Sequence, residues 1–557
     1  MLKDHPKGLL VAFFANMGER FGFYTMMAIL VLFLQAKFGL TGANAGVIYA
    51  VFYASIYALA LVGGIVADRF AGLKKTITLG IVAMALGYVL IAIPGLGLIP
   101  VCAGLLIIAF GNGMFKGNLQ AVVGNLYEDE KYASKRDSAF SIFYMGINIG
   151  ALFAPTVAIS LKHWVLAGQG FIDKAELPAM CWNVIHGVEG ASTKLAEVAS
   201  SAYITAPASL PDMTTFANQY ITAFSTGYNY AFGFAALMMV VSLAVYFGFN
   251  HYLTPGYSIA PKLSKDGTQV ADMPKAQEKE RIVALLLVFA VVIFFWMSFH
   301  QNGLSMTYFA RDYVQRDVPG STFFWFDLWT LLPLFGAAYG IYMLINKTSK
   351  ASIRAIGLAM AAIFGGIAYY KLSGMPALNK FSPELFQHLN PFFIVALTPI
   401  AVASFSWLNA KGIEPSAPRK IGFGMLLAAL GFAVMSIGSL GLTSQATLAG
   451  SPVPEGELVT PYLLIGTYFI LTIAELFLSP MGISFVSKVA PPRYKGIMQG
   501  GWLAATAIGN QLLFIGALLY DRVSLSALWA FFVVCCLISA TFIFSMMKRL
   551  ERVTNGA

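Results

Sequence analysis

The sequence predicts an all-α integral membrane protein with 14 transmembrane helices, and two observations carry this prediction. Hydrophobic residues make up 58% of the 557 residues and charged residues only 11%, whereas about a quarter of the residues of a soluble domain are charged. Apolar runs of about 20 residues, the helix length that crosses a hydrocarbon core of about 30 Å, also recur along the whole chain.

The apolar runs fall into two sets of six and one additional pair. The first set lies at 9–36, 44–67, 76–98, 99–124, 138–161 and 228–249, and the second at 282–310, 391–410, 420–442, 461–487, 497–519 and 524–547. The additional pair lies at 322–345 and 353–370. We therefore expect an N-terminal six-helix bundle over 1–250 and a C-terminal bundle over 282–557 that also carries the extra pair, about 322–370.

Two connections are longer than simple loops. Residues 162–227 form an insertion on the outer side, and residues 251–281 form a Lys-rich cytoplasmic linker with three prolines between the two bundles. Most of the 36 Lys and Arg residues fall on the same side as the N-terminus, and this bias marks the cytoplasmic side. The sequence thus predicts a multi-pass protein of the cell (inner or plasma) membrane with both termini in the cytoplasm.

The net charge of +10 reports this topology, so the expected partner is the lipid bilayer and not nucleic acid. There is no phosphate-binding glycine loop, no paired-histidine metal motif and no nucleophile elbow in the sequence. We therefore expect a protein that is not an enzyme and needs no cofactor.

Five ionisable residues lie at membrane depth on four of the predicted spans: Glu19, Arg20, Lys116, His300 and Glu475. A charge at mid-bilayer costs about 2.5 to 3.5 kcal/mol on the lenient insertion scale, so such residues line polar cavities or pair internally. Two acids and two bases balance, which suits a polar cavity of a transporter. The alternative is that they form ion pairs that only hold helices together.

Aromatic and amide side chains accompany these charges. They are Tyr24, Tyr57, Asn148, Trp296 and Trp502. Each alone could equally pack in the core or face lipid, and their positions beside the buried charges favour a binding site. Residues 63–75, with paired glycines and an acid-base cluster after the second span, resemble the cytoplasmic loop motif of the major facilitator superfamily.

Several strings of residues resemble the proton-dependent oligopeptide transporter (POT/PTR) family of that superfamily, of which this chain looks like an atypical member. They lie at 18–24, 115–118, 137–150, 390–391 and 475–480. The resemblance implies two six-helix bundles, alternating access, and uptake of di- and tripeptides driven by protons as the coupling ion. It also implies short peptides as partners, and we expect a monomer.

The resemblance further implies roles for individual residues. Glu19, Arg20 and Lys116 would serve proton coupling and Glu475 would meet the peptide amino group. The pocket would be lined by Tyr24, Tyr57, Asn148, Trp296, Asn390, Ser479 and Trp502. From the residues of this chain we further expect Glu475 and His300 to take part in proton coupling, and Lys116, joined by His300 when protonated, to hold the peptide carboxylate.

Three positions depart from the family pattern: Asn16 and His300 stand where the family has Glu, and Met27 where it has Arg. Loss of both Arg and Glu keeps the charge balanced, since removal of only one would leave an unpaired buried charge. The departures leave open a rival with the same fold that transports a non-peptide anion or a peptide-like metabolite. A non-transporting receptor or membrane enzyme is the remaining alternative.

Overall fold

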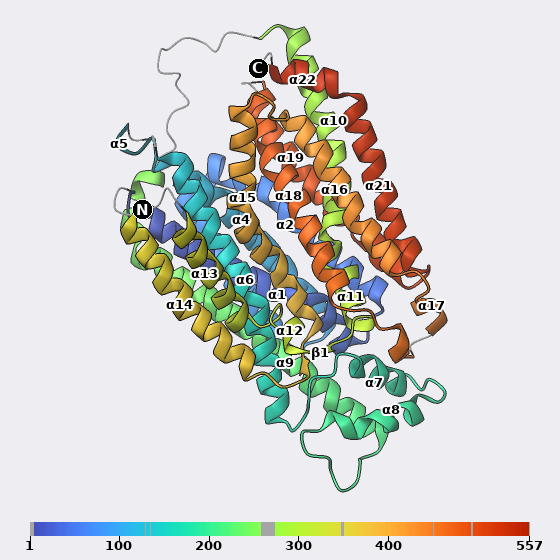
Figure 1. Cartoon of the computed structure of the whole chain (residues 1–557). Coiled ribbons are helices and arrows are strands. Elements are labelled where there is room, and N and C mark those ends of the chain that lie inside the picture. Colours follow the sequence, from blue (N-terminus) through green and yellow to red (C-terminus); the bar gives the residue numbers. More distant parts are fainter. Residues whose placement is uncertain are drawn as a thin grey trace.

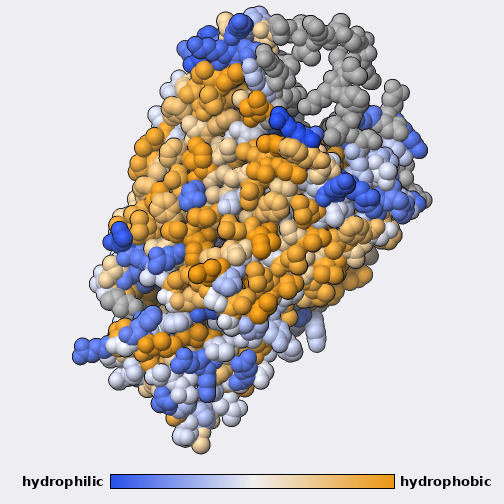
Figure 2. Space-filling model, turned by 180° about the vertical axis from the view of Figure 1, so that it is seen from behind, coloured by the Kyte–Doolittle hydropathy of each residue, from blue (hydrophilic) through white to orange (hydrophobic). Residues whose placement is uncertain are grey.

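The computed structural model describes residues 5–128, 130–133, 135–257, 273–346, 350–448, 451–491 and 494–555. Long helices run between two ends of the molecule (Figure 1). Both termini lie toward one end, which we call the termini end, and residues 169–212 lie at the opposite end, the insertion end. Figure 2 shows a broad apolar belt between two more polar ends, as expected of a protein that spans a bilayer.

The N-terminal half contains six long helices: α1 (Gly8–Phe38), α2 (Gly42–Val66), α3 (Gly72–Ala92), α4 (Leu98–Asn125), α6 (Arg136–Gly168) and α9 (Met213–Gly248). Its short elements are η1 (Ala67–Ala71), α5 (Glu130–Ala133), α7 (Leu177–Ile185), α8 (Ala191–Ala199) and η2 (Ser200–Ala202). The helix α1 packs against α6 and α9, while α4 packs against α2 and α3. These contacts make the first half one bundle.

The C-terminal half contains α10 (Lys275–Phe299), α13 (Leu328–Ile345), α14 (Ala351–Ser373), α15 (Leu389–Ala410), α16 (Ala417–Gly438), α18 (Tyr462–Val489), α19 (Lys495–Gln511), α20 (Phe514–Tyr520) and α21 (Leu525–Ser545). Its short helical elements are η5 (His300–Gly303), α11 (Ser305–Asp312), α12 (Gly320–Phe323), η6 (Pro383–His388), α17 (Gln445–Leu448), η7 (Glu455–Glu457) and α22 (Met547–Asn555). Helix α16 packs against α18 and α21, and α10 packs against α19. Between the halves lie η3 (Asn250–Tyr252) and η4 (Thr254–Tyr257), and residues 258–272 of the expected linker lie outside the described residues.

Local chemistry sets several helix ends. The Asp212 carboxylate accepts hydrogen bonds from the backbone N–H groups of Thr214 (3.1 Å) and Thr215 (3.0 Å), and so caps the start of α9. Helix α1 ends at Gly39, whose φ of 63° is the left-handed conformation that glycine adopts without a steric penalty. The insertion is consequently shorter than the predicted 162–227, because α6 continues to Gly168 and α9 begins at Met213.

Thirteen helical stretches among the described residues are long and apolar enough to cross a membrane. The expected 14 stay a prediction, because α2 and α3 are joined by the π-helix η1 and count as one stretch of 51 residues, Gly42–Ala92. Such a stretch is about twice as long as one crossing requires. The backbone leaves the helical conformation at Gly72, where φ is 74° and ψ is 159°, so the chain can turn there.

The additional pair forms a helical hairpin, α13 and α14. Gly340 and Gly357 let the two backbones touch, since a side chain at either position would collide with the other helix. Two short antiparallel strands, β1 (Asp317–Val318) and β2 (Asn379–Lys380), close the base of this inserted unit, with Asp317 opposite Lys380. An even number of inserted helices leaves the direction of all later spans unchanged.

The two halves meet along two lines. Helix α2 packs against α19 and α20, and α6 packs against α15 and η6. The half of α2 near the insertion end is buried in this contact, whereas most of its other half is partly or fully exposed. The halves are therefore held together most closely toward the insertion end.

Candidate functional site

Glu19 and Arg20, adjacent on α1, form a buried ion pair. The guanidinium donates from Nε to Glu19 Oε2 and from Nη2 to Glu19 Oε1, both at 2.5 Å, and the Asn112 amide on α4 donates to Oε1 at 2.6 Å. Both carboxylate oxygens are thus occupied by protein donors. Sequence reasoning missed Asn112, although it lies one helical turn before Lys116 and so on the same face of α4.

Lys116 has a different environment. Its Nζ lies 5.1 Å from the centroid of the Tyr57 ring on α2, and its charge interacts with those of Glu19 and Arg20. Among the residues that the structure describes, none forms an ion pair with Lys116. The side chain is half-buried within the bundle.

Glu475 on α18 is the corresponding acid in the C-terminal half. Its Oε2 accepts a hydrogen bond of 2.9 Å from the Asn390 amide on α15, which also donates to Thr472 Oγ1 at 3.1 Å. No described residue forms an ion pair with Glu475. Tyr24 and Tyr57 of the N-terminal half lie close enough to interact with its charge, so the two halves contribute to one region.

His300 lies where α10 ends within a membrane span. Its ring stacks on Trp296 with centroids 4.7 Å apart, Nδ1 lies 2.6 Å from Asn510 Oδ1, and Nε2 lies 3.1 Å from the Tyr53 hydroxyl. The bond to Tyr53 joins α2 to the C-terminal half. Sequence reasoning missed Tyr53 and Asn510, although Tyr53 lies one helical turn before Tyr57.

The remaining predicted residues are less closely connected. The Asn148 amide donates to the Tyr144 carbonyl of its own helix at 3.2 Å, and Ser479 is half-buried on α18. The buried Trp502 ring lies directly against Gly482 of α18. Two of the positions that depart from the family pattern, Met27 and Asn16, are buried. Asn16 and the buried pocket residue Trp296 each carry an N–H donor that bonds to no described residue.

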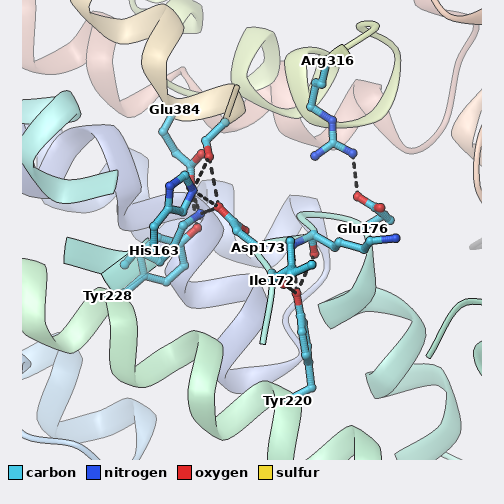
Figure 3. A network of polar contacts seen from close by, with 11 residues as sticks. His163, Ile172, Asp173, Glu176, Tyr220, Tyr228, Arg316 and Glu384 are labelled. Carbon is cyan, nitrogen blue, oxygen red and sulfur yellow. Dashed lines mark hydrogen bonds and ion pairs between the residues drawn. The ribbon is translucent and has the colours of Figure 1, made fainter. Parts of the chain in front are cut away.

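A second buried charge cluster lies nearer the insertion end, and sequence reasoning missed it (Figure 3). Lys162 of α6 and Glu384 of η6 are both fully buried and form an ion pair of 2.9 Å between the two halves. Lys162 also binds Asp173 of the insertion at 2.8 Å, and Tyr228 donates to Glu384 Oε1 at 2.6 Å. The prediction that five residues account for the charges at depth was wrong, because Lys162 was placed at a helix end while α6 continues to Gly168.

The insertion itself connects the halves. Ser382 donates to Asp173 at 3.0 Å, and Arg316 donates to Glu176 at 2.6 Å, as Figure 3 shows for the second pair. Lys194 of α8 donates to Ser451 at 2.9 Å. Residues 169–212, which belong to the N-terminal half, are therefore fastened to the C-terminal half at three points.

Asp173 keeps its negative charge near neutral pH. Burial alone would raise the pKa of this carboxyl, but the Lys162 ammonium and the neighbouring His163 outweigh that effect and hold the pKa well below its usual value. Because the pKa is lowered in the folded protein, the ionised carboxylate stabilises the fold at pH values above its ordinary pKa of about 3.9. This stabilisation is lost only as the pH falls through the lowered pKa. The Asp173 carboxylate thus stays ionised between about pH 5.5 and 7.5.

The helical bundles and the buried charges are those expected of a multi-span membrane transporter. A match to a transporter family of the major facilitator superfamily shows that the protein is a transporter and not an enzyme. The sequence model of the POT family matches residues 74–265 and 376–529. This match covers more than half of the chain, and the chain belongs to the POT family.

The chain is similar over most of its length to curated relatives. It is 24% identical to the dipeptide and tripeptide permease B of Xenorhabdus bovienii, with 92% of this chain and 86% of the relative covered. It is 27% identical to the peptide transporter YePEPT of Yersinia enterocolitica, with 91% and 86% covered. Among solved structures, that of a peptide transporter POT in complex with sulfate has a TM-score of 0.68 at 21% identity, with 99% and 96% covered.

Proposed function

We propose that this protein is a proton-coupled secondary importer of di- and tripeptides that works by alternating access. One observation carries the proposal: Lys116 in one half is a base and Glu475 in the other is an acid, and neither has an ion-pair partner among the described residues. A short peptide has an ammonium and a carboxylate at its two ends. It would neutralise both side chains at once, and the tyrosines between them would accept varied side chains.

The names of the relatives support this substrate class, since they are peptide transporters and dipeptide and tripeptide permeases. Glu19 and Arg20 fit a coupling role better than a binding role, because they already neutralise each other. A proton on Glu19 would release Arg20 to act elsewhere. No cofactor other than the proton enters this scheme.

Contacts at the insertion end support alternating access. The Tyr308 hydroxyl donates to the Gly42 carbonyl at 2.9 Å, and Arg311 donates to Gln35 at 2.7 Å, so both bonds join the two halves. With the Lys162–Glu384 pair they form a closed gate at that end. Following the Lys and Arg bias, we infer that the protein lies in the plasma membrane with the insertion end outside the cell and both termini in the cytoplasm.

Uptake into proteoliposomes tests the proposal. A labelled dipeptide should accumulate when an inward proton gradient is imposed, and a protonophore should abolish accumulation. Binding without accumulation would favour a receptor. One homologous structure is described as tetrameric, and the mass of the purified protein in detergent would test our expectation of a monomer.

A non-peptide cargo is the second candidate, and Met27 favours it because the Arg that would hold a carboxylate is absent. A POT family structure in complex with 5-aminolevulinic acid, at 19% identity and a TM-score of 0.67, shows that a related fold holds such a metabolite. Competition decides between the two. If zwitterionic metabolites displace label and a panel of dipeptides does not, the peptide assignment is wrong.

Lys116→Ala should abolish proton-driven accumulation, because the variant loses both the coupling base and the cation for the peptide carboxylate. Amidated dipeptides, which lack that carboxylate, should bind the variant about as well as free dipeptides do. Competition binding and accumulation assays measure the two effects. Lys371→Ala, at the far end of α14, is the matched control and should transport normally, whereas accumulation by Lys116→Ala would exclude the coupling role.

His300→Gln should flatten the pH dependence of transport. Uptake by the wild type should rise as external pH falls from about 7.5 to 5.5, a range that spans the ordinary imidazole pKa of about 6.5. A protonated His300 would then replace the missing Arg as a partner for the peptide carboxylate. Initial rates across this range measure the effect.

His388 provides the control for that experiment. It is equally buried in the C-terminal half, but its Nε2 bonds to the Trp325 carbonyl at 2.7 Å, away from the site charges. His388→Gln should keep the wild-type profile. Superimposable normalised profiles of the wild type and His300→Gln would show that another group titrates.

A further inference from the structure

His300 and Asn510 face each other at two breaks in membrane-spanning helices. Helix α10 ends at Phe299, just before His300, and α19 ends at Gln511, just after Asn510. The Gln301 amide donates to the Leu513 carbonyl at 3.1 Å and so satisfies a backbone group that the second break frees. Irregular backbone at membrane depth is expected where a span serves a polar site.

The side chains form a chain of hydrogen bonds, Asn510–His300–Tyr53. Asn510 is fully buried, while His300 is 6% and Tyr53 8% exposed. With the amide oxygen of Asn510 facing Nδ1, that nitrogen must carry a hydrogen, because an amide oxygen only accepts. The neutral ring then accepts from the Tyr53 hydroxyl at Nε2.

Gain of a proton changes the two bonds differently. At Nδ1 the ring donates to Asn510 in both forms, and the bond becomes charge-assisted in the cation. At Nε2 the direction reverses, so the Tyr53 oxygen must become the acceptor and its hydrogen must turn away. The same two partners therefore hold both forms of the ring. Asn510 accepts in both forms and favours the cation, whereas Tyr53 donates to the neutral ring and favours the neutral form.

The other groups around His300 are few. Lys116 on α4 interacts with it electrostatically and opposes a second positive charge. On α2, Tyr49 and Tyr57 adjoin Tyr53, and on α10 the Trp296 ring stacks on the imidazole. No described acid forms an ion pair with His300, so the Asn510 oxygen is the group that stabilises a proton on the ring.

We propose that Asn510 and Tyr53 are positioning residues that set the proton affinity of His300 and hence the pH at which this transporter works. Asn510 lies in the same half as His300 and stays with it, whereas Tyr53 belongs to the other half and would separate from it when the insertion end opens. The affinity of His300 for a proton then depends on which end is open. This inference rests on the proposed proton-coupled function.

Three variants test the proposal: Asn510→Asp, Asn510→Leu and Tyr53→Phe. The measured quantity is the midpoint of the dependence of transport on pH. Asp at 510 places an anion against the imidazole, so the midpoint should move to higher pH by about one unit or more. Leu at 510 removes the acceptor at Nδ1, so the midpoint should move to lower pH. Phe at 53 removes the hydroxyl that donates to the neutral ring, so the midpoint should move to higher pH. A merely structural role would reduce rates without moving the midpoint.

Tryptophan fluorescence gives a readout that needs no transport. An imidazolium quenches a stacked indole more strongly than a neutral imidazole, so the component of emission lost in Trp296→Phe should titrate with pH in the purified protein. This pH-dependent signal should be absent from His300→Gln. Its midpoint should shift in Asn510→Asp, Asn510→Leu and Tyr53→Phe in the same directions as the midpoint of transport. If this titration is seen and no peptide is transported, the proposed function fails while the positioning roles stand.

Two results would overturn the inference. One is an identical midpoint in the wild type and Asn510→Asp, which are nearly isosteric. The other is a Trp296 signal that does not change between about pH 4.5 and 8.5, since the imidazole pKa is ordinarily about 6.5. Opposite shifts for Asp and Leu at position 510, found in fluorescence and in transport, support it.

Discussion

Glu475→Gln abolishes peptide uptake and weakens dipeptide binding by about 2 to 5 kcal/mol. The substitution keeps the shape of the side chain and its bond from Asn390, which is 2.9 Å long in the native protein. It removes the negative charge that would face the peptide ammonium, and a desolvated ammonium without a counter-charge is costly. Competition binding in detergent measures the loss separately from transport.

The control for this variant is Glu457→Gln. Glu457 accepts bonds from the backbone N–H (2.7 Å) and the hydroxyl (2.8 Å) of Thr443, outside the membrane spans. This variant should bind peptide normally. N-acetylated dipeptides, which lack the ammonium, should bind poorly to the wild type and with about the same affinity to Glu475→Gln. If free dipeptides bind Glu475→Gln as tightly as the wild type, Glu475 is not part of the site.

Lys162→Met destabilises the protein by about 3 to 5 kcal/mol, because it leaves the buried carboxylates of Glu384 and Asp173 without their shared cation. The midpoint of thermal unfolding in detergent should fall clearly. The double variant Lys162→Met with Glu384→Gln should recover part of the loss, since one stranded charge is removed while an oxygen remains to accept from Tyr228.

The Lys420–Glu414 ion pair offers the comparison. It lies within the C-terminal half, and the Glu414 side chain is 26% exposed, so water can solvate the carboxylate when Lys420 is replaced. Lys420→Met should therefore cost much less than Lys162→Met. Equal losses for the two variants would mean that the Lys162 cluster is not sealed from water and does not serve as the gate at the insertion end.

Much of the fold follows from the sequence because bilayer thickness fixes the length of an apolar helix. The predicted spans 391–410 and 524–547 correspond closely to α15 and α21. Span limits were least accurate where a helix extends beyond its apolar run, as α6 does past Lys162 and α9 does before the predicted start at 228. Lys162 is buried there by η6 of the other half and Tyr220 by the insertion, and hydropathy along one segment contains no information about such contacts.

The candidate site, like the fold, was predicted from the sequence only in part. The sequence alone determined the class of protein and identified five of its intramembrane ionisable residues, though not Lys162, because a charge in an apolar run is conspicuous and its cost limits its possible roles. Only the tertiary structure decided which charges are paired: Glu19 with Arg20, and Lys162 with Glu384, which is 222 residues away. It also brought His300 to Tyr53 and Asn510, at separations of 247 and 210 residues. Such partners are set by how helices of the two halves pack, and that packing depends on the whole chain.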